Sequence, residues 1–222
     1  MRPDKRDSAQ IRALSCAQNV LSRADGSARF DFGKTSVLCS VHGPAEVRLR
    51  EEKLDKATLD ISILPLKGIS GTKDRVVEYF LRSTLEPVIL TTLHPRTCIQ
   101  VIAQVLQNDG CVLSAVINAA SLALINAGIP MRSVPASVSC IVKDGNIILD
   151  PAEEEMENST STHTFSFDSE GQLLLCESLG SFTDTEFDKC LSLCLDGVKK
   201  VHGFMRMALE KKMEKEHQQR CS

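Results

Sequence analysis

The sequence predicts an α+β fold in which mostly antiparallel sheets carry helices on one side. Two observations support this prediction. Residues 13–64 and 134–177 read as strands, and helical patterns at residues 72–88, at 112–127 and after residue 183 separate or follow them. The 222 residues are 42% hydrophobic and 25% charged, which is ordinary for one globular domain or two fused halves.

The first strands alternate apolar and polar residues. Asp25-Gly26 predicts a tight turn between two of them. The next strand, TSVLCSVHG, is apolar enough to be buried, and Gly43-Pro44 is expected to end it. A charged stretch then predicts a loop, and a further alternating strand ends at Pro65.

The following loop, residues 66–74, contains glycine and leads into a helix that Thr72 or Asp74 can cap. Pro87 is expected to kink or end this helix. Residues 98–107 predict a strand. The segment 112–127 is apolar nearly all round, which predicts a buried helix that Gly128 ends.

Asp144-Gly145 predicts a hairpin, and a second hairpin follows in residues 162–177. A final helix is expected to begin near Thr183. We therefore expect a flexible N-terminus over residues 1–10, one folded domain over residues 11–210, and a charged, frayed tail over residues 211–222.

The composition narrows the class of protein. The net charge of −3 gives no bulk attraction to nucleic acid, and the chain shows neither a bilayer-long apolar run nor a secretory signal, so we expect no membrane association. The nine cysteines are scattered without paired CxxC motifs, which favours buried thiols in a reducing compartment and no bound metal. With no Trp and one Tyr, a base-stacking platform is not expected.

Five segments, in this order, resemble the RNase PH family: DGSA (25–28), SVLCSVHGPAEV (36–47), LEPVILTTLHPRT (85–97), QVLQNDG (104–110) and INAASLALINAGIPMR (117–132). The resemblance covers about residues 12–208 and is strongest to subunits of the eukaryotic exosome ring. It implies the RNase PH fold, with two pseudo-symmetric βαβ-type halves of the S5 domain 2-like kind. It also implies either trimming of RNA 3′ ends with phosphate or a structural place in a ring that trims.

The same resemblance locates the family's chemistry on this sequence. Active members bind phosphate with an Arg shortly after the turn that here reads Gln107-Asn108-Asp109-Gly110, and Leu113 stands at the Arg position. Their two acidic residues fall six and twelve positions after Asp150, where this chain has Met156 and Thr162. We therefore expect no intact catalytic residue and no cofactor. The acids near these positions, which could form a rearranged Mg²⁺ site if the chain were a nuclease, are Asp150, Glu155 and Glu157.

Basic residues that contact RNA in the family are retained. Lys67, Lys73 and Arg75 match a basic loop, and Arg96 matches an Arg in the turn before the central strand. Such residues bind backbone phosphates rather than bases or sugars, so we expect them to bind RNA without discriminating against DNA.

These features favour a non-catalytic exosome-ring subunit over an enzyme. The expected partners are other RNase PH-like ring subunits and RNA, in the nucleus, nucleolus and cytoplasm. Two alternatives stay open: a residual exonuclease with a rearranged acidic site, and a free homodimer that binds nucleic acid and assists DNA degradation in cell death. Val47, Leu49 and Leu59 are the apolar residues expected on the surface that pairs two copies of the isolated chain.

Overall fold

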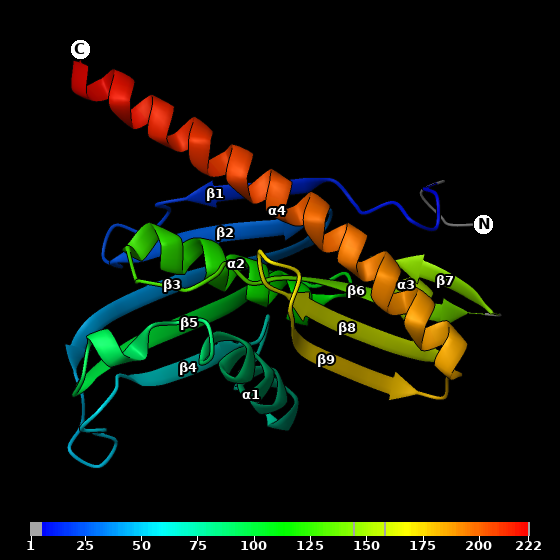
Figure 1. The fold of residues 1–222 in the computed structure, drawn as a ribbon, viewed down its shortest axis with the longest axis horizontal. Helices are drawn as coiled ribbons and strands as arrows, with labels where there is room; N and C mark the ends of the chain where they lie inside the picture. The colour runs from blue at the N-terminus through cyan, green and yellow to red at the C-terminus, as the bar shows by residue number, and fades with distance from the viewer. Residues whose placement is uncertain (1–5, 144, 158, 222) are drawn as a thin grey trace.

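The computed structural model describes residues 6–143, 145–157 and 159–221, and it confirms the α+β fold. Two sheets lie side by side, one helix packs in the middle of the molecule, and a long helix crosses the whole molecule diagonally (Figure 1). Among the described residues, no helix is long and apolar enough to span a membrane.

The first sheet has five strands in the order β1-β2-β3-β5-β4. All neighbours are antiparallel except β4 and β5, which are parallel and are joined through helix α1 and the short 3₁₀ helix η1. The bounds are β1 Leu14–Gln18, β2 Gly26–Phe32, β3 Thr35–Glu46, β4 Thr58–Leu64, α1 Thr72–Leu85, η1 Thr91–Leu93 and β5 Thr97–Gln107.

The second sheet is antiparallel, with strand order β7-β6-β8-β9. The short helix α3 connects β7 to β8, and the long helix α4 packs on β6 and β8 and reaches β1. The bounds are β6 Ala136–Lys143, β7 Asn146–Leu149, α3 Glu153–Met156, β8 Ser161–Phe167, β9 Leu173–Gly180 and α4 Asp184–Cys221.

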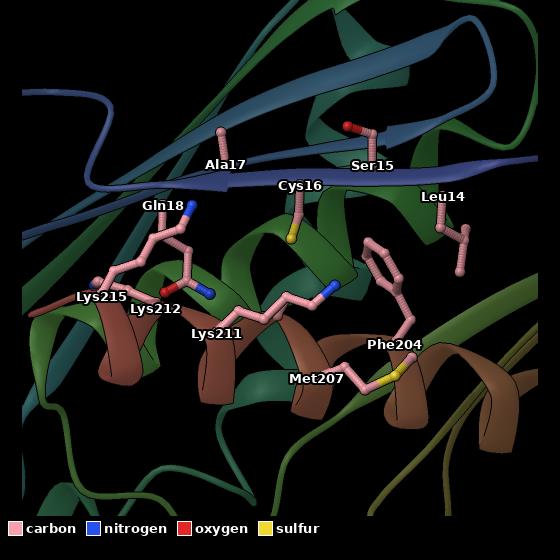
Figure 2. A pocket seen from close by; sticks show the side chains of 11 residues that line it. Leu14, Ser15, Cys16, Ala17, Gln18, Phe204, Met207, Lys211, Lys212 and Lys215 are labelled. Atoms are coloured by element: carbon pink, nitrogen blue, oxygen red, sulfur yellow. The ribbon is translucent and has the colours of Figure 1, made fainter. Parts of the chain in front are cut away.

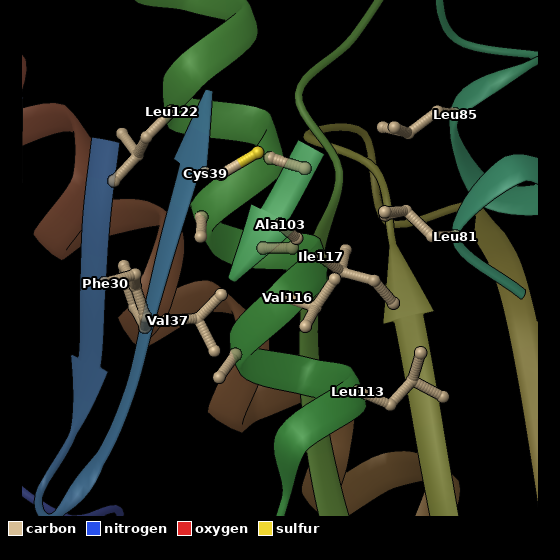
Figure 3. Packing of buried hydrophobic residues seen from close by; sticks show 14 of the residues in the cluster. Phe30, Val37, Cys39, Leu81, Leu85, Ala103, Leu113, Val116, Ile117 and Leu122 are labelled. Carbon is tan, nitrogen blue, oxygen red and sulfur yellow. The ribbon is translucent and has the colours of Figure 1, made fainter. Parts of the chain in front are cut away.

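Helix α2, Val112–Ala127, forms the centre of the core, as its apolar composition predicts. Every residue from Leu113 to Leu124 is buried, because the helix packs on β2 and β3 and also contacts β6 (Figure 3). Its buried polar side chains have partners: the Asn118 amide donates to Ser137 O at 3.0 Å and accepts from Ser137 N–H at 2.8 Å. The two sheets therefore share one core built around α2.

Three predictions about where turns, strands and helices begin or end need correction. The connection from β1 to β2 is a loop over residues 19–25, and the tight turn of this sheet lies one strand later, at Gly33-Lys34. Strand β3 runs through Gly43-Pro44 with a bulge between His42 and Ala45. Proline fits there because the pairing of β3 with β2 ends at Val41, so the missing N–H is not needed. Gly71, not Thr72 or Asp74, is the N-cap of α1, and the Asp74 carboxylate accepts its N–H at 2.7 Å.

The two ends of the described chain are helical at the C-terminus and hydrogen-bonded to β7 near the N-terminus. Helix α4 continues to Cys221, where a frayed tail is predicted from residue 211. Of the predicted flexible N-terminus, residues 1–5 lie outside the described part, whereas Ser8 accepts the Leu149 N–H at 2.8 Å. Leu59, expected on an exposed surface, is buried in the core because its side chain faces inward from β4. Leu49 is exposed and Val47 is half-buried.

Candidate functional site

The three positions singled out by the sequence lie together in space. Leu113 comes from the first turn of α2, Met156 from α3 and Thr162 from β8, and all three line one cavity of about 190 Å³, here called the α2–β8 cavity. The residues between them in the chain form the β6–β7 hairpin and α3, which bring the distant positions to one place. The other lining residues are Val77, Cys111, Val112, Ser139, Cys140, Ile141, Pro151, His163, Thr164, Glu177 and Leu179.

The α2–β8 cavity carries no positive charge at neutral pH. None of its lining residues is Lys or Arg. Burial lowers the pKa of His163, an effect that the charge of Glu186 opposes, and the ring nitrogens lie 3.0 Å from Ser161 Oγ and 2.8 Å from Ser178 Oγ. The imidazole is thus held neutral between two hydroxyl groups.

The only carboxylate of this cavity among its lining residues is Glu177, on β9 opposite Thr164. Burial raises the pKa of Glu177. Burial also raises the pKa of the Cys111 thiol, which lies 3.2 Å from Pro151 O. A negative or neutral lining disfavours an anion such as phosphate, which needs charge-assisted donors to replace its water.

Asp150, the reference point of the acidic motif, is a structural residue. It is 1% exposed, and its carboxylate accepts three hydrogen bonds from Arg12: from the backbone N–H at 2.8 Å, from Nε at 3.0 Å and from Nη2 at 2.7 Å. Burial lowers the pKa of Arg12, but the hydrogen bond and charge of Asp150 outweigh it, so the pKa lies above its ordinary value. Arg12 has no motif around it, which is why sequence reasoning missed it.

The remaining acids do not converge on one point. Glu155 is buried and caps its own helix, because its Oε2 accepts the Ala152 N–H at 2.9 Å, whereas Glu153, Glu154 and Glu157 are exposed. The acidic run is therefore a capped turn of helix with most of its carboxylates in solvent. In the described part of the chain, no three His, Cys, Asp or Glu side chains are placed to hold a metal ion. With Asp150 held by Arg12, the acids present do not fit a Mg²⁺ site.

The four predicted nucleic-acid contacts form two separate groups. Lys67, Lys73 and Arg75 are exposed around the loop that enters α1, beyond the C-terminal end of β4. Arg96 precedes β5, and its side chain is 66% exposed, with Nε 3.5 Å from Glu52 Oε1. Because β4 and β5 are parallel over seven residue pairs, the two groups lie at opposite ends of these strands, about 20 Å apart.

Arg96 has basic neighbours that the sequence reading did not single out. Its backbone N–H donates to Lys53 O at 3.2 Å, so the loop of residues 47–57 lies beside it, at the lower left of Figure 1. Arg48, Arg50 and Lys53 of this loop are exposed. The sequence does show a charged stretch after β3, but its acidic and basic residues are nearly equally frequent, so it indicated a surface loop and not a basic patch.

The chain matches two models of the 3′ exoribonuclease family: domain 1 (RNase_PH) over residues 10–130 and domain 2 (RNase_PH_C) over residues 133–197. It is 34% identical over 228 residues to a rice protein named exosome complex exonuclease RRP46 homolog, covering 95% of this chain and 96% of the relative. It is 36% identical over 189 residues to the exosome complex component RRP46 of Saccharomyces cerevisiae, covering 78% and 85%.

The fold agrees with these sequence matches. The crystal structure of rice Rrp46 superposes with a TM-score of 0.90 at 33% identity, and the match covers 94% of this chain and 100% of that one. The two sheets and the long C-terminal helix thus have the RNase PH arrangement that the resemblance implies. This chain belongs to the RNase PH, or 3′ exoribonuclease, family.

Proposed function

We propose that this chain is an RNase PH-like subunit of an exosome core ring, and that it takes part in 3′-to-5′ RNA processing and degradation without cleaving RNA itself. Family membership and the similarity to proteins named as exosome components support the ring assignment. The observation that supports the non-catalytic part is the α2–β8 cavity, where Leu113, Met156 and Thr162 meet without any cation.

The chemistry explains why this cavity counts against phosphorolysis. An attacking phosphate must be desolvated and held, which requires charged donors, and the leaving oxygen needs an acid or a metal ion nearby. Leu113 offers only methyl groups, Met156 a thioether and Thr162 a neutral hydroxyl. Losing general acid–base assistance alone costs about 10²- to 10⁴-fold in rate, and losing the phosphate site adds to that loss.

The proposed subunit retains exposed basic residues that can bind RNA and exposed apolar residues that can bind a protein partner. The two basic groups, one at Lys67, Lys73 and Arg75 and one at Arg96, are exposed and placed to bind an RNA backbone. Large apolar side chains surround the first group, which favours a protein partner there. They are Leu66, Ile69, Val76 and Tyr79, and Ile69 is 95% exposed.

The isolated chain is proposed to form a homodimer through the surface around Val47 and Leu49, with a ring paralogue taking the same place in the assembled complex. Light scattering on the pure protein tests this: twice the 24.3 kDa chain mass supports self-association, and a monomer at micromolar concentration contradicts it. Localisation to nucleus, nucleolus and cytoplasm is part of the same proposal, and microscopy of a tagged chain tests it.

The decisive experiment is a phosphorolysis assay on a uniformly labelled single-stranded RNA. We expect no phosphate-dependent release of nucleoside diphosphates, with or without Mg²⁺, while RNA still binds. Release that requires phosphate and is abolished by Glu177→Gln would overturn the non-catalytic assignment. Hydrolysis without phosphate would instead favour the residual-nuclease alternative, which the Arg12–Asp150 ion pair disfavours.

A further inference from the structure

A groove outside the candidate site has features of a protein-docking surface. It lies between the strand β1 and the C-terminal half of α4 and has a volume of about 520 Å³ (Figure 2). We call it the β1–α4 groove. Its lining residues are Leu14, Ser15, Cys16, Ala17, Gln18, Phe204, Met207, Ala208, Lys211, Lys212 and Lys215.

One wall of this groove is an open strand edge. Strand β1 is the last strand of its sheet. Gly33 N–H donates to Ala13 O at 2.9 Å and Asn19 N–H donates to Ser27 O at 2.8 Å, so odd-numbered residues of this segment bond to β2. In an antiparallel pair the alternate residues point the other way. The backbone N–H and C=O groups of Leu14, Cys16 and Gln18 therefore point away from the sheet, available to another strand.

The other wall divides the groove into an apolar half and a cationic half. Phe204 and Met207 lie beside the Leu14 end of β1, and Lys212 and Lys215 lie toward the Gln18 end, whereas Lys211 extends below Cys16 between them (Figure 2). No ion pair of Lys211 or Lys215 is present within the described residues, and the nearby Glu210 pairs with Arg206. Lys212 donates to the Asn126 side chain.

Gln18 gives an independent sign of a missing partner. Its side-chain Nε2 and Oε1 are both buried, and neither has a hydrogen-bond partner among the described residues. A buried polar atom left unsatisfied is unfavourable, and such atoms are rare in folded proteins. A ligand that both donates and accepts, as a peptide group does, would satisfy the two atoms once the side chain turns toward the groove.

We propose that the β1–α4 groove docks an extended acidic segment of a partner protein. The segment adds to the edge of β1 as a further strand, through backbone hydrogen bonds to Leu14, Cys16 and Gln18. Its apolar side chains cover Phe204 and Met207, and its carboxylates face Lys211, Lys212 and Lys215. The division of the wall fixes the order along the segment, with the acidic end beside Gln18.

A protein segment fits these features better than RNA does. The strand edge offers donors and acceptors with the spacing of a peptide backbone, and the apolar half of the groove offers no charged donor to an RNA phosphate. Lysines alone attract either polymer, so the experiment must separate the two.

The test measures fluorescence anisotropy with a labelled peptide of about six residues, the length of β1. Its first half is apolar and its second half is glutamate. Controls are the same peptide with Gln for Glu, the same peptide with alternate amides N-methylated, and a single-stranded RNA of equal charge. We expect the acidic peptide to bind full-length protein, and both peptide controls to bind at least about tenfold more weakly.

Two charge-reversal variants place the binding in the groove. Lys211→Glu with Lys215→Glu should weaken peptide binding at least about tenfold, because two attractions become repulsions. Lys199→Glu with Lys200→Glu makes the same charge change at exposed positions of the same helix and should leave binding unchanged. Equal losses in both variants, full binding of the N-methylated peptide, or groove-dependent binding of RNA in place of peptide would each overturn the proposal. Circular dichroism confirms that both variants keep the fold.

Discussion

Breaking the buried pair Arg12–Asp150 on one side should be among the most destabilising single changes in this chain. The Arg12 side chain is 6% exposed and that of Asp150 is 2%, and Arg12 joins the N-terminal segment to the residue after β7. We expect Arg12→Met to reduce the free energy of unfolding by about 3–5 kcal/mol, because it leaves an uncompensated buried carboxylate. For a chain of this length that loss lowers Tm by roughly 10 °C.

The assay is urea unfolding of four proteins: the parent, Arg12→Met, Asp150→Asn and the double variant. Asparagine suits position 150, where φ is +49°, because it tolerates the left-handed region. The double variant removes both charges, so we expect it to be more stable than Arg12→Met alone. The exposed pair Lys199–Asp196 is the matched control, and Lys199→Ala should cost less than about 1 kcal/mol. A loss below about 1 kcal/mol for Arg12→Met would refute the reasoning.

Three further outcomes follow from the structure. Because burial raises the folded-state pKa of Glu177, its contribution to stability is complete below pH 4.5 and is lost as pH rises through the folded pKa, so Glu177→Gln should raise Tm at pH 7.5 but not at pH 4. Gly26→Ala should destabilise the fold, since a Cβ there lies 2.4 Å from Ala123 O, whereas Gly203→Ala, with nothing within 4 Å, should stabilise α4 by about 0.5–1 kcal/mol in thermal unfolding. Lys73→Glu and Arg96→Glu should each reduce the salt slope of RNA binding by about 0.7 per lost phosphate contact, and an RNA shorter than about six nucleotides should respond to only one of them in a filter-binding titration.

Local patterns were enough to predict the elements whose environment is uniform. Helix α2 is apolar on all sides because it is enclosed on all sides, so composition and environment agree over Leu113–Leu124. The α2–β8 cavity could also be located, because the family resemblance supplied the positions of Leu113, Met156 and Thr162 and the fold brings them together. No pattern in the sequence indicated that Glu177 and His163 line the same cavity, because strand pairing alone brings them there.

The interactions that sequence reasoning missed depend on distant pairs. Arg12 and Asp150 are 138 positions apart, and nothing in the sequence around Arg12 marks it as the partner of Asp150. The N-cap of α1 and the end of β3 were misplaced for a related reason. At both places the boundary depends on which backbone N–H groups have a hydrogen-bond acceptor nearby. Pro44 can lie within β3 because the pairing of β3 with β2 already ends at Val41.

The separation of the two basic groups could have been derived from the sequence by one more step. A strand, a crossover helix and a second strand in parallel must place the residue after the first strand and the residue before the second at opposite ends of the sheet. Lys67 follows β4 and Arg96 precedes β5, so parallel pairing alone puts them about 20 Å apart. An RNA that contacts both groups must therefore run along the β4 edge of the sheet. For this reason the length of the RNA, and not only its charge, should decide whether a substitution in one group or in both weakens binding.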